Sequence, residues 1–189
     1  MKVVGIVCSP RKGGNTEILV REALKSVHED GCETELILVA DKNIGFCDGC
    51  GACVESGVCR INDDMQMIYQ QLESADGIIL GTPVYFGNVS AQAKAIMDRT
   101  YAFLWVRKLR DKVAAAIVVA RRVGALQVRN LLFGHFAGHR MIIAGAGIGY
   151  GRKRGEVREG PGGSHNLSAI EEARAVGKNV VRMIEKLSK

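Results

Sequence analysis

The sequence contains no long hydrophobic run. Within its 189 residues, no uninterrupted apolar stretch approaches the roughly 18 residues of a membrane-spanning helix. The apolar run at the N-terminus ends at Pro10 and charged residues follow at once, whereas a secretory signal peptide needs a longer apolar region and a small-residue cleavage site. We therefore expect a cytoplasmic protein that has no membrane partner.

Low-complexity tracts and internal repeats are also absent, and the composition is not that of a disordered chain. Hydrophobic residues make up 47% and charged residues 24% of the sequence, which is typical of a globular protein. A chain of this length usually forms one domain, and its hydrophobic core is large enough to be stable without disulfide bonds. We expect a single domain over residues 1–189.

Apolar, β-branched segments alternate with segments of helical periodicity along the chain. The expected strands cover residues 2–8, 33–40, 76–82, 112–120 and 140–144. The expected helices cover residues 16–28, 64–74, 90–105, 124–136 and 167–189. This alternation predicts an α/β fold with a doubly wound, five-stranded parallel sheet. Residues 41–63 and 145–163 show neither periodicity, and we expect both to be loops, the first inserted after strand 2.

Ligands of such sheets bind at the carboxyl ends of the strands. The loop after the first expected strand lacks both the Gly-Lys-Ser/Thr of a Walker loop and the Gly-x-Gly-x-x-Gly pattern. A cysteine phosphatase would need an arginine six positions after Cys8, where Gly14 stands. Hydroxyls, two cations and free amides at a helix N-terminus nevertheless suit a phosphate group. The loop reads Ser9-Pro10-Arg11-Lys12-Gly13-Gly14-Asn15-Thr16.

The loop after the third expected strand reads Thr82-Pro83-Val84-Tyr85-Phe86-Gly87-Asn88-Val89-Ser90. It places two aromatic side chains beside exposed backbone amides at the same edge of the sheet. A flat aromatic ligand needs this combination of an apolar wall and hydrogen bonds to its ring heteroatoms. Together the two loops predict one ligand that carries both a phosphate and an aromatic ring system.

These two loops and the helix sequence Ala93-Lys94-Ala95-Ile96-Met97-Asp98-Arg99 resemble the flavodoxin-like NADPH-dependent FMN reductases. The resemblance covers most of residues 1–136 and implies FMN as a cofactor. It implies that the FMN phosphate is held by Ser9, Arg11, Asn15 and Thr16. It implies that the isoalloxazine ring is framed by Pro83, Val84, Tyr85, Phe86, Gly87 and Asn88. The turn after the fourth strand, with Arg121 and Gly124, would approach the same pocket.

Four of the six cysteines lie close together, with the spacing Cys-x2-Cys-x2-Cys-x5-Cys between residues 47 and 59. In a reducing compartment, clustered cysteines indicate metal or redox ligands before disulfides. Successive gaps of two residues are typical of iron–sulfur proteins, whereas structural zinc sites usually have two cysteine pairs with a longer spacer. The spacing favours a 4Fe–4S cluster over zinc, and zinc over disulfides or free thiols.

An FMN domain with a compact cysteine motif after its second strand resembles the iron–sulfur flavoproteins of anaerobic prokaryotes. The resemblance implies one 4Fe–4S cluster held by Cys47, Cys50, Cys53 and Cys59. Residues 41–63 would then be the cluster-binding loop of a flavodoxin-like FMN-binding domain. The resemblance also implies a dimer or a dimer of dimers, and electron transfer between cluster and flavin.

The leading functional hypothesis is an oxidoreductase that passes electrons between a one-electron carrier and a two-electron acceptor. The cofactors carry this chemistry, so we assign no catalytic side chain. Two alternatives remain open. One is an NAD(P)H-dependent FMN or quinone reductase with a structural zinc or no metal in the cysteine loop. The other is a non-enzymatic redox sensor.

The chain carries 26 Lys and Arg against 20 Asp and Glu, a formal net charge of +6. Its basic clusters at residues 107–110 and 152–154 lack interleaved aromatics, so we expect no nucleic-acid partner. We expect solvated faces there, with docking of an acidic, ferredoxin-like electron carrier as the alternative. His135 and His139 are expected to be surface or packing side chains at a helix end, not metal ligands.

Overall fold

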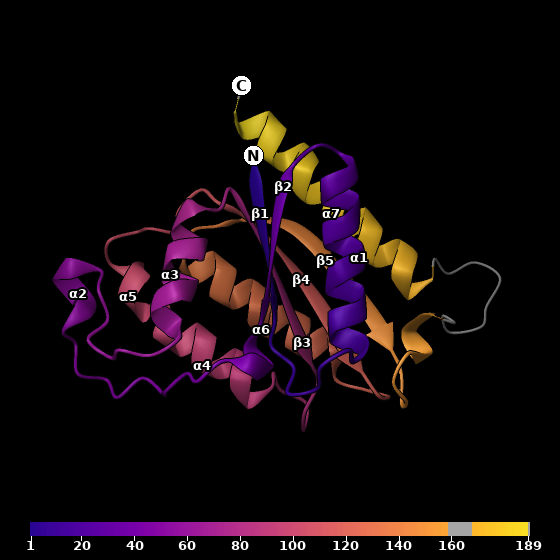
Figure 1. The fold of residues 1–189 in the computed structure, drawn as a ribbon, viewed down its shortest axis with the longest axis horizontal. Helices are drawn as coiled ribbons and strands as arrows, with labels where there is room; N and C mark the ends of the chain where they lie inside the picture. The colour runs from indigo at the N-terminus through magenta and orange to yellow at the C-terminus, as the bar shows by residue number, and fades with distance from the viewer. Residues whose placement is uncertain (159–167, 189) are drawn as a thin grey trace.

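The structure is a computed structural model that describes residues 1–158 and 168–188. Its centre is a five-stranded sheet with the strand order β2-β1-β3-β4-β5, in which every pair of neighbours is parallel. This arrangement confirms the predicted doubly wound α/β fold (Figure 1). The strands are β1 (Lys2–Val7), β2 (Glu33–Leu38), β3 (Gly77–Pro83), β4 (Val113–Ala120) and β5 (Ile142–Tyr150).

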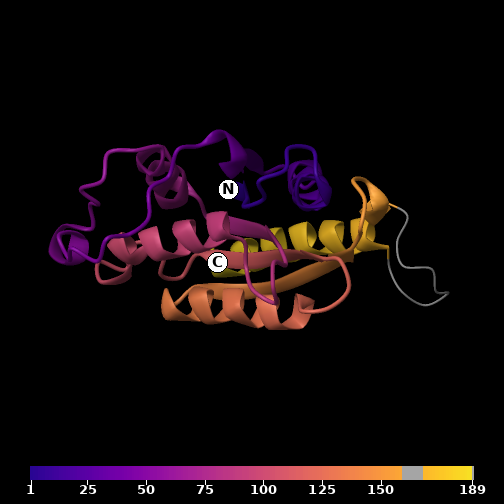
Figure 2. The ribbon, with the colours of Figure 1, turned by 90° about the horizontal axis from the view of Figure 1, so that it is seen from below.

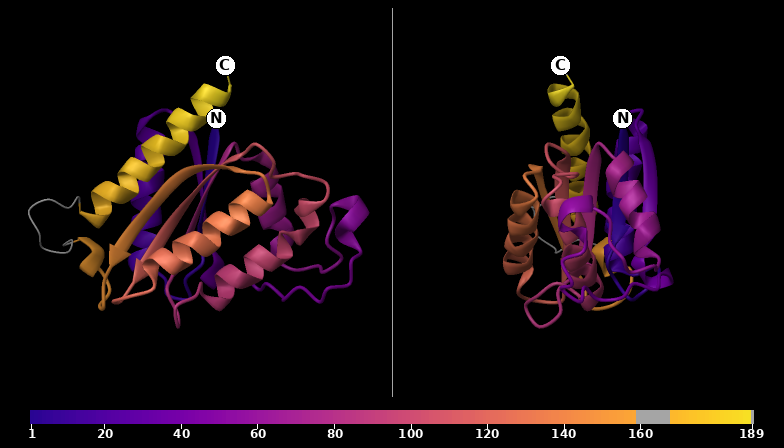
Figure 3. Two further views of the ribbon diagram at one scale, coloured as in Figure 1. Left: turned by 180° about the vertical axis from the view of Figure 1, so that it is seen from behind. Right: turned by 90° about the vertical axis from the view of Figure 1, so that its left-hand side faces the viewer.

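Helices cover both faces of the sheet. One face packs against α1 (Asn15–Glu29) and α7 (Ala169–Leu187). The other packs against α3 (Met65–Ser74), α4 (Ala91–Arg99) and α6 (Ala125–Gly138). Two short helices, α2 (Cys53–Ser56) and α5 (Tyr101–Leu104), lie beside each other at one side of the molecule, as Figures 1 and 3 show.

The central strand β4 shows why these residues form a sheet between two helical layers. All eight of its side chains are buried, as expected for a parallel strand covered on both faces. Val113, Ala115 and Ile117 belong to the core beneath α1 and α7. Alternate residues such as Ala114 and Ala116 belong to the core beneath α6. The continuous apolar run therefore supplies both cores from one strand.

The last strand is longer than predicted. We expected a strand over residues 140–144 followed by a loop, whereas β5 pairs with β4 as far as Tyr150. Two of its glycines, Gly147 and Gly149, are strand positions with close neighbours. A Cβ on Gly149 would lie 2.6 Å from a methyl carbon of Leu19, and one on Gly147 would lie 3.1 Å from Ile117. The glycine-rich sequence therefore reflects close packing and not a loop, so that part of the prediction was wrong.

Two smaller differences concern helix boundaries. The helix predicted over residues 90–105 is divided at Thr100 into α4 and α5, and residues 53–56 of the predicted cysteine loop form α2. The predicted last helix begins at 167, which lies outside the described residues, and so do residues 159–163 of the predicted loop. None of the helices in the described ranges is long and apolar enough to span a membrane.

Candidate functional site

A cavity of about 460 Å³ opens at the carboxyl edge of the sheet. Its volume lies within the range of about 300–1,000 Å³ that small-molecule sites occupy. Four segments that follow β1, β3, β4 and β5 line it. The lining residues are Ser9, Arg11, Lys12, Gly14, Asn15, Thr16, Pro83, Val84, Tyr85, Val119, Ala120, Arg121, Gly151, Arg152, Lys153 and Arg154. The two loops predicted to share one ligand therefore meet in one cavity.

The loop after β1 forms the end of this cavity that suits a phosphate. Ser9 and Thr16 are buried polar residues, and both line the cavity. Helix α1 begins after Gly14, which provides no side-chain cap, so the first amides of the helix are free to bind an anion. Glu17, in the first turn of α1, is buried, and its carboxylate accepts a hydrogen bond from the Gly13 amide at 2.5 Å.

The segment after β5 closes the phosphate end of the cavity. The Asn15 side chain donates to the Lys153 carbonyl at 2.9 Å and accepts from the Gly155 amide at 2.7 Å. Arg154 Nε donates to the Gly13 carbonyl at 2.8 Å. We expected the basic cluster at 152–154 to be a solvated face, and all three residues are exposed; the structure adds that they also line the cavity. Asn15 holds this segment in place, and its contact with a phosphate stays a prediction.

The loop after β3 divides into a part that lines the cavity and a part that stands beyond it. Pro83, Val84 and Tyr85 are lining residues, as is Arg121 after β4. A short turn follows, in which Tyr85 and Asn88 exchange two backbone hydrogen bonds of 2.9 Å. Phe86 at the tip is fully exposed.

Two glycines support the same turn. A Cβ on Gly124 would lie 3.3 Å from Gly87, so the turns after β3 and β4 touch each other. In the described part of the chain, Phe86, Gly87, Asn88 and Gly124 are not among the residues that line the cavity. Their predicted contacts with a ring stay predictions.

The four clustered cysteines line a second, small cavity. The lining residues are Cys47, Asp48, Gly49, Cys50, Gly51, Cys53, Cys59, Arg60, Ile61, Arg99, Tyr101 and Ala102. Gly49 and Gly51 have φ angles of 68° and 73°, a left-handed conformation that glycine adopts without strain. These two glycines turn the backbone sharply between the first three cysteines.

The electrostatics of this cavity show that its four sulfurs affect one another. Burial raises the pKa of the Cys53 thiol, and the neighbouring thiolates of Cys59, Cys47 and Cys50 raise it further. Four thiolates that line one cavity would repel one another, and a cationic group bound between them would offset that repulsion. Within residues 1–158 and 168–188, no group of three or more His, Cys, Asp or Glu side chains is arranged so that it could hold a metal ion.

The two cavities share no lining residue. The segment that carries the four cysteines, residues 47–59 (the cysteine segment), projects at one end of the molecule. The segment after β5 lies at the opposite end (Figures 1 and 2). One chain therefore offers two separate sites, one suited to a phosphate-bearing aromatic ligand and one lined by four thiols.

Comparison with known proteins is consistent with both sites. Residues 1–153 match the family described as NADPH-dependent FMN reductase. An iron–sulfur flavoprotein of Methanocaldococcus jannaschii is 41% identical over the full length of both chains. An iron–sulfur flavoprotein of Methanosarcina thermophila is 39% identical over 80% of this chain and 81% of its own.

Solved structures show the same fold at low sequence identity. RosB with a bound formylriboflavin phosphate intermediate aligns with a TM-score of 0.76 and 17% identity, covering 100% of this chain and 80% of RosB. A WrbA-like flavodoxin from Agrobacterium tumefaciens aligns with a TM-score of 0.65 and 19% identity, covering 98% and 97% of the two chains. The fold is flavodoxin-like. The chain belongs to the NADPH-dependent FMN reductase family, and the two relatives that are 41% and 39% identical to it place it with the iron–sulfur flavoproteins.

Proposed function

We propose that this flavin-dependent oxidoreductase passes electrons between a one-electron carrier and a two-electron acceptor through FMN and a 4Fe–4S cluster. The observation that carries the proposal is the presence in one chain of a cavity for a phosphate-bearing ring and a cavity lined by four cysteines. When bound, the flavin converts between one- and two-electron chemistry and the cluster handles single electrons.

FMN fits the cavity at the carboxyl edge of the sheet. The uncapped start of α1 and the buried hydroxyls of Ser9 and Thr16 would bind the phosphate. The side chains of Arg11 and Arg154, which line the same cavity, would balance its charge. Val84 and Tyr85 would form the apolar wall against the ring.

A 4Fe–4S cluster fits the cysteine cavity by the chemistry of its donors. Cys47, Cys50, Cys53 and Cys59 supply four thiolates, the ligand set of such clusters. The names of the Methanocaldococcus and Methanosarcina relatives support the same assignment. We propose one cluster per chain in the loop of residues 41–63, which belongs to the same FMN-binding domain as the rest of residues 1–189.

An acidic, ferredoxin-like carrier is the one-electron partner that the surface suits best. The basic cluster at residues 107–110 lies beside the cysteine segment, because a Cβ on Gly57 would meet Val106 at 2.6 Å and Lys108 at 3.4 Å. Positive charge next to the electron-transfer site steers an acidic carrier towards it. We also propose a cytoplasmic location, where the thiols stay reduced.

We further propose that the protein is a homo-oligomer, a dimer or a dimer of dimers. Exposed apolar side chains at the start and along the outer surface of α6, Val123, Leu126 and Leu131, support this proposal because such side chains are often covered by another chain. Light scattering on the purified protein tests it, and a monomer at micromolar concentration would contradict it.

A second candidate function is reduction of FMN or quinones by NAD(P)H. The family to which the chain belongs is described as NADPH-dependent. The cavity also holds five cations after β1 and β5, namely Arg11, Lys12, Arg152, Lys153 and Arg154, more than one phosphate needs. Anaerobic mixing with NADPH separates the two functions, because rapid bleaching of the flavin would favour this candidate.

The first candidate is tested by counting electrons in an anaerobic reductive titration. The holoprotein should take up about three electrons per chain, two for the flavin and one for the cluster. Cys50→Ala should lower the count to about two. Cys32→Ala, at a buried cysteine outside the loop, is the matched control and should leave the count unchanged. A count of about two in the wild type contradicts the proposed function.

A further inference from the structure

Arg99 is the most deeply buried charged side chain beside the cysteine cavity. It is the last residue of α4, its side chain has 0% exposure, and it lines the cavity with the four cysteines. Burying a guanidinium is costly unless its charge is paired and its N–H groups are bonded. The contacts of this side chain therefore show what it does.

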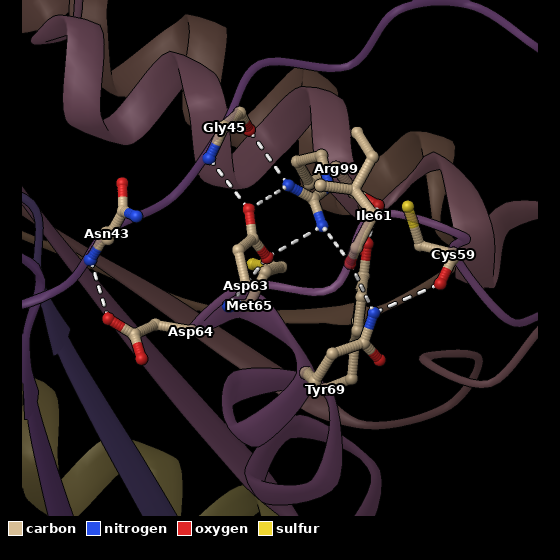
Figure 4. A network of polar contacts seen from close by, with 10 residues as sticks. Asn43, Gly45, Cys59, Ile61, Asp63, Asp64, Met65, Tyr69 and Arg99 are labelled. Carbon is tan, nitrogen blue, oxygen red and sulfur yellow. Dashed lines mark hydrogen bonds and ion pairs between the residues drawn. The ribbon is translucent and has the colours of Figure 1, made fainter.

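Arg99 holds both ends of the cysteine segment (Figure 4). Its Nη1 donates to the Gly45 carbonyl at 2.9 Å, and its Nη2 reaches the Ile61 carbonyl at 3.4 Å. Gly45 stands two residues before Cys47, and Ile61 stands two residues after Cys59. One side chain from α4 thus joins the backbone on either side of the four thiols.

Asp63 balances the charge and strengthens the same connection. Its carboxylate accepts from Arg99 Nη1 at 2.7 Å and from Nη2 at 3.0 Å, a bidentate pair. It also accepts from the Gly45 amide at 2.7 Å. Burial alone would raise the pKa of Asp63, but the hydrogen bonds from Arg99, Gly45 and Met65 outweigh burial and lower it.

Two side chains of α3 complete the support. Gln66 donates from Nε2 to the Cys59 carbonyl at 3.0 Å and to the Ile61 carbonyl at 2.7 Å. The hydroxyl of Tyr69 donates to the Arg99 carbonyl at 2.6 Å. These contacts fix the position of Cys59, the cysteine that is separated from the other three by the longest gap.

Arg99 has one further hydrogen-bond donor, its Nε–H group. Among the described residues, its Nε is the one buried side-chain nitrogen or oxygen without a hydrogen-bond partner. Buried polar groups nearly always have a partner, so an orphan donor on a residue that lines the cysteine cavity points to an acceptor within that cavity. A thiolate or sulfide of a bound cluster is such an acceptor.

We propose that Arg99 is a positioning residue that fixes both ends of the cysteine segment and favours the reduced state of the cluster. The inference rests on the proposed function, because it requires a cluster in this cavity. Reduction adds negative charge to the cluster. Asp63 already pairs with the guanidinium, so the stabilisation comes from the free Nε–H donor, which belongs to a charged group in a poorly solvated site. Hydrogen bonds to the sulfurs and local charge are known to set the potentials of such clusters.

The test measures the reduction potential of the cluster by EPR-monitored titration, together with iron and sulfide content. Removing Arg99 alone would leave Asp63 as an unpaired buried charge, so the main variant is the double substitution Asp63→Asn with Arg99→Gln. It should lower the ratio of reduced to oxidised cluster at least tenfold at a given potential, a shift of about 59 mV for one electron.

Arg99→Lys separates the charge from the hydrogen bonds of the guanidinium. Lysine keeps the charge but can neither form the bidentate pair nor supply the Nε donor, so the potential should fall as in the double variant, and iron should be lost faster to a chelator. Lys94→Gln, at an exposed position on the same helix, is the control and should change neither readout.

The outcomes distinguish this inference from the proposed function. A double variant that keeps its iron and has the wild-type potential overturns the role of Arg99 and leaves the proposed function intact. Wild-type protein without iron and sulfide overturns both. If the double variant does not retain its cluster, Arg99→Lys decides, because unchanged chelator resistance in that variant contradicts the positioning role.

Discussion

Thr16 is the residue that most directly joins the fold to the predicted phosphate site. Its methyl group packs towards the strand β3, 3.2 Å from where a Cβ on Gly81 would lie, and the residue lines the cavity. The hydroxyl is therefore the part of the side chain that is available to a ligand. Thr16→Val removes the hydroxyl and keeps the packing.

We expect Thr16→Val to weaken FMN binding about tenfold, roughly 1.4 kcal/mol, because a hydrogen bond to a charged group is lost. Fluorescence titration of the flavin-free protein measures this change. Riboflavin, which lacks the phosphate, is the matched ligand, and its affinity should be unchanged. Equal weakening of both ligands would show that Thr16 acts on packing and not on the phosphate.

Individual residues were predicted best where a motif is local in the sequence. Ser9, Arg11, Thr16 and the Pro83–Tyr85 stretch were identified from two short loops, and the structure gathers them in one cavity. The contribution of residues 152–154 was missed because it depends on the length of β5. An alternating strand that continues through residues 144, 146, 148 and 150 would have placed these cations at the same edge of the sheet.

At the scale of elements, α1 and α7 approach each other closely. A Cβ on Gly177 of α7 would lie 2.2 Å from both the Ala23 carbonyl oxygen and Ser26 Oγ of α1. Ser26 Oγ donates across the same contact to the Arg174 carbonyl at 2.8 Å. The two helices can approach this closely because position 177 has no side chain.

Gly177→Ala should therefore destabilise the protein by about 1–3 kcal/mol, because the helices must separate. Gly134→Ala is the matched control, since Gly134 also lies in a helix but a Cβ at this position would have no neighbour within 4 Å. The control should stabilise by about 0.5–1 kcal/mol through helix propensity. Urea denaturation measures both, and equal effects would contradict the close-contact explanation.

The end of α6 carries the two histidines that were expected to be packing or surface residues. His139 is buried, and its Nε2 lies 3.0 Å from Thr100 Oγ1. The pKa of His135 is lowered to about 3, chiefly by burial and then by the nearby His139. Burial also lowers the pKa of His139. Both rings are therefore neutral in the folded protein at neutral pH, as packing residues require.

This pair predicts how stability depends on pH. A histidine whose pKa is lower in the folded state contributes fully above its ordinary value of 6.5, and that contribution is lost as the pH falls towards the folded value. The free energy of unfolding should thus decrease as the pH falls from about 6.5 towards about 3, the folded pKa of His135. His135→Asn should flatten this dependence in urea titrations. A profile as steep as that of the wild type would contradict it.

At the element scale, the order of strands and helices was predicted, and the errors lie where packing overrides local signals. The glycines of β5 indicate a loop when read alone, but Gly147 and Gly149 are small residues packed against α1 and α7. The helix break at Thr100 is likewise a tertiary effect, because its hydroxyl lies against His139 and donates to the Met97 carbonyl. The contact with His139 is not visible in the local sequence.

At the scale of the whole molecule, the formal charge of +6 becomes understandable from the two proposed cofactors. A 4Fe–4S cluster with its thiolates carries about −2, and the FMN phosphate about −2. Residues 152–154 bring three cations to the cavity that suits a phosphate, whereas Arg99 at the cysteine cavity is already paired with Asp63. The charge that the cofactors would add is thus balanced chiefly at the phosphate end.

The relative placement of the two cavities was beyond the reach of the sequence. The spacing of the cysteines predicts a shared site, but not that this site lies at the opposite end of the molecule from the segment after β5 (Figure 2). That placement follows from the strand order, because the cysteine segment leaves the sheet after the edge strand β2 and the cationic segment follows the other edge strand, β5.

The most direct test of the central claim is the cofactor content of anaerobically purified protein. Iron, acid-labile sulfide and flavin should be present at about four, four and one per chain, the composition of one 4Fe–4S cluster and one FMN. Zinc without sulfide, or protein that carries no flavin, would contradict the account.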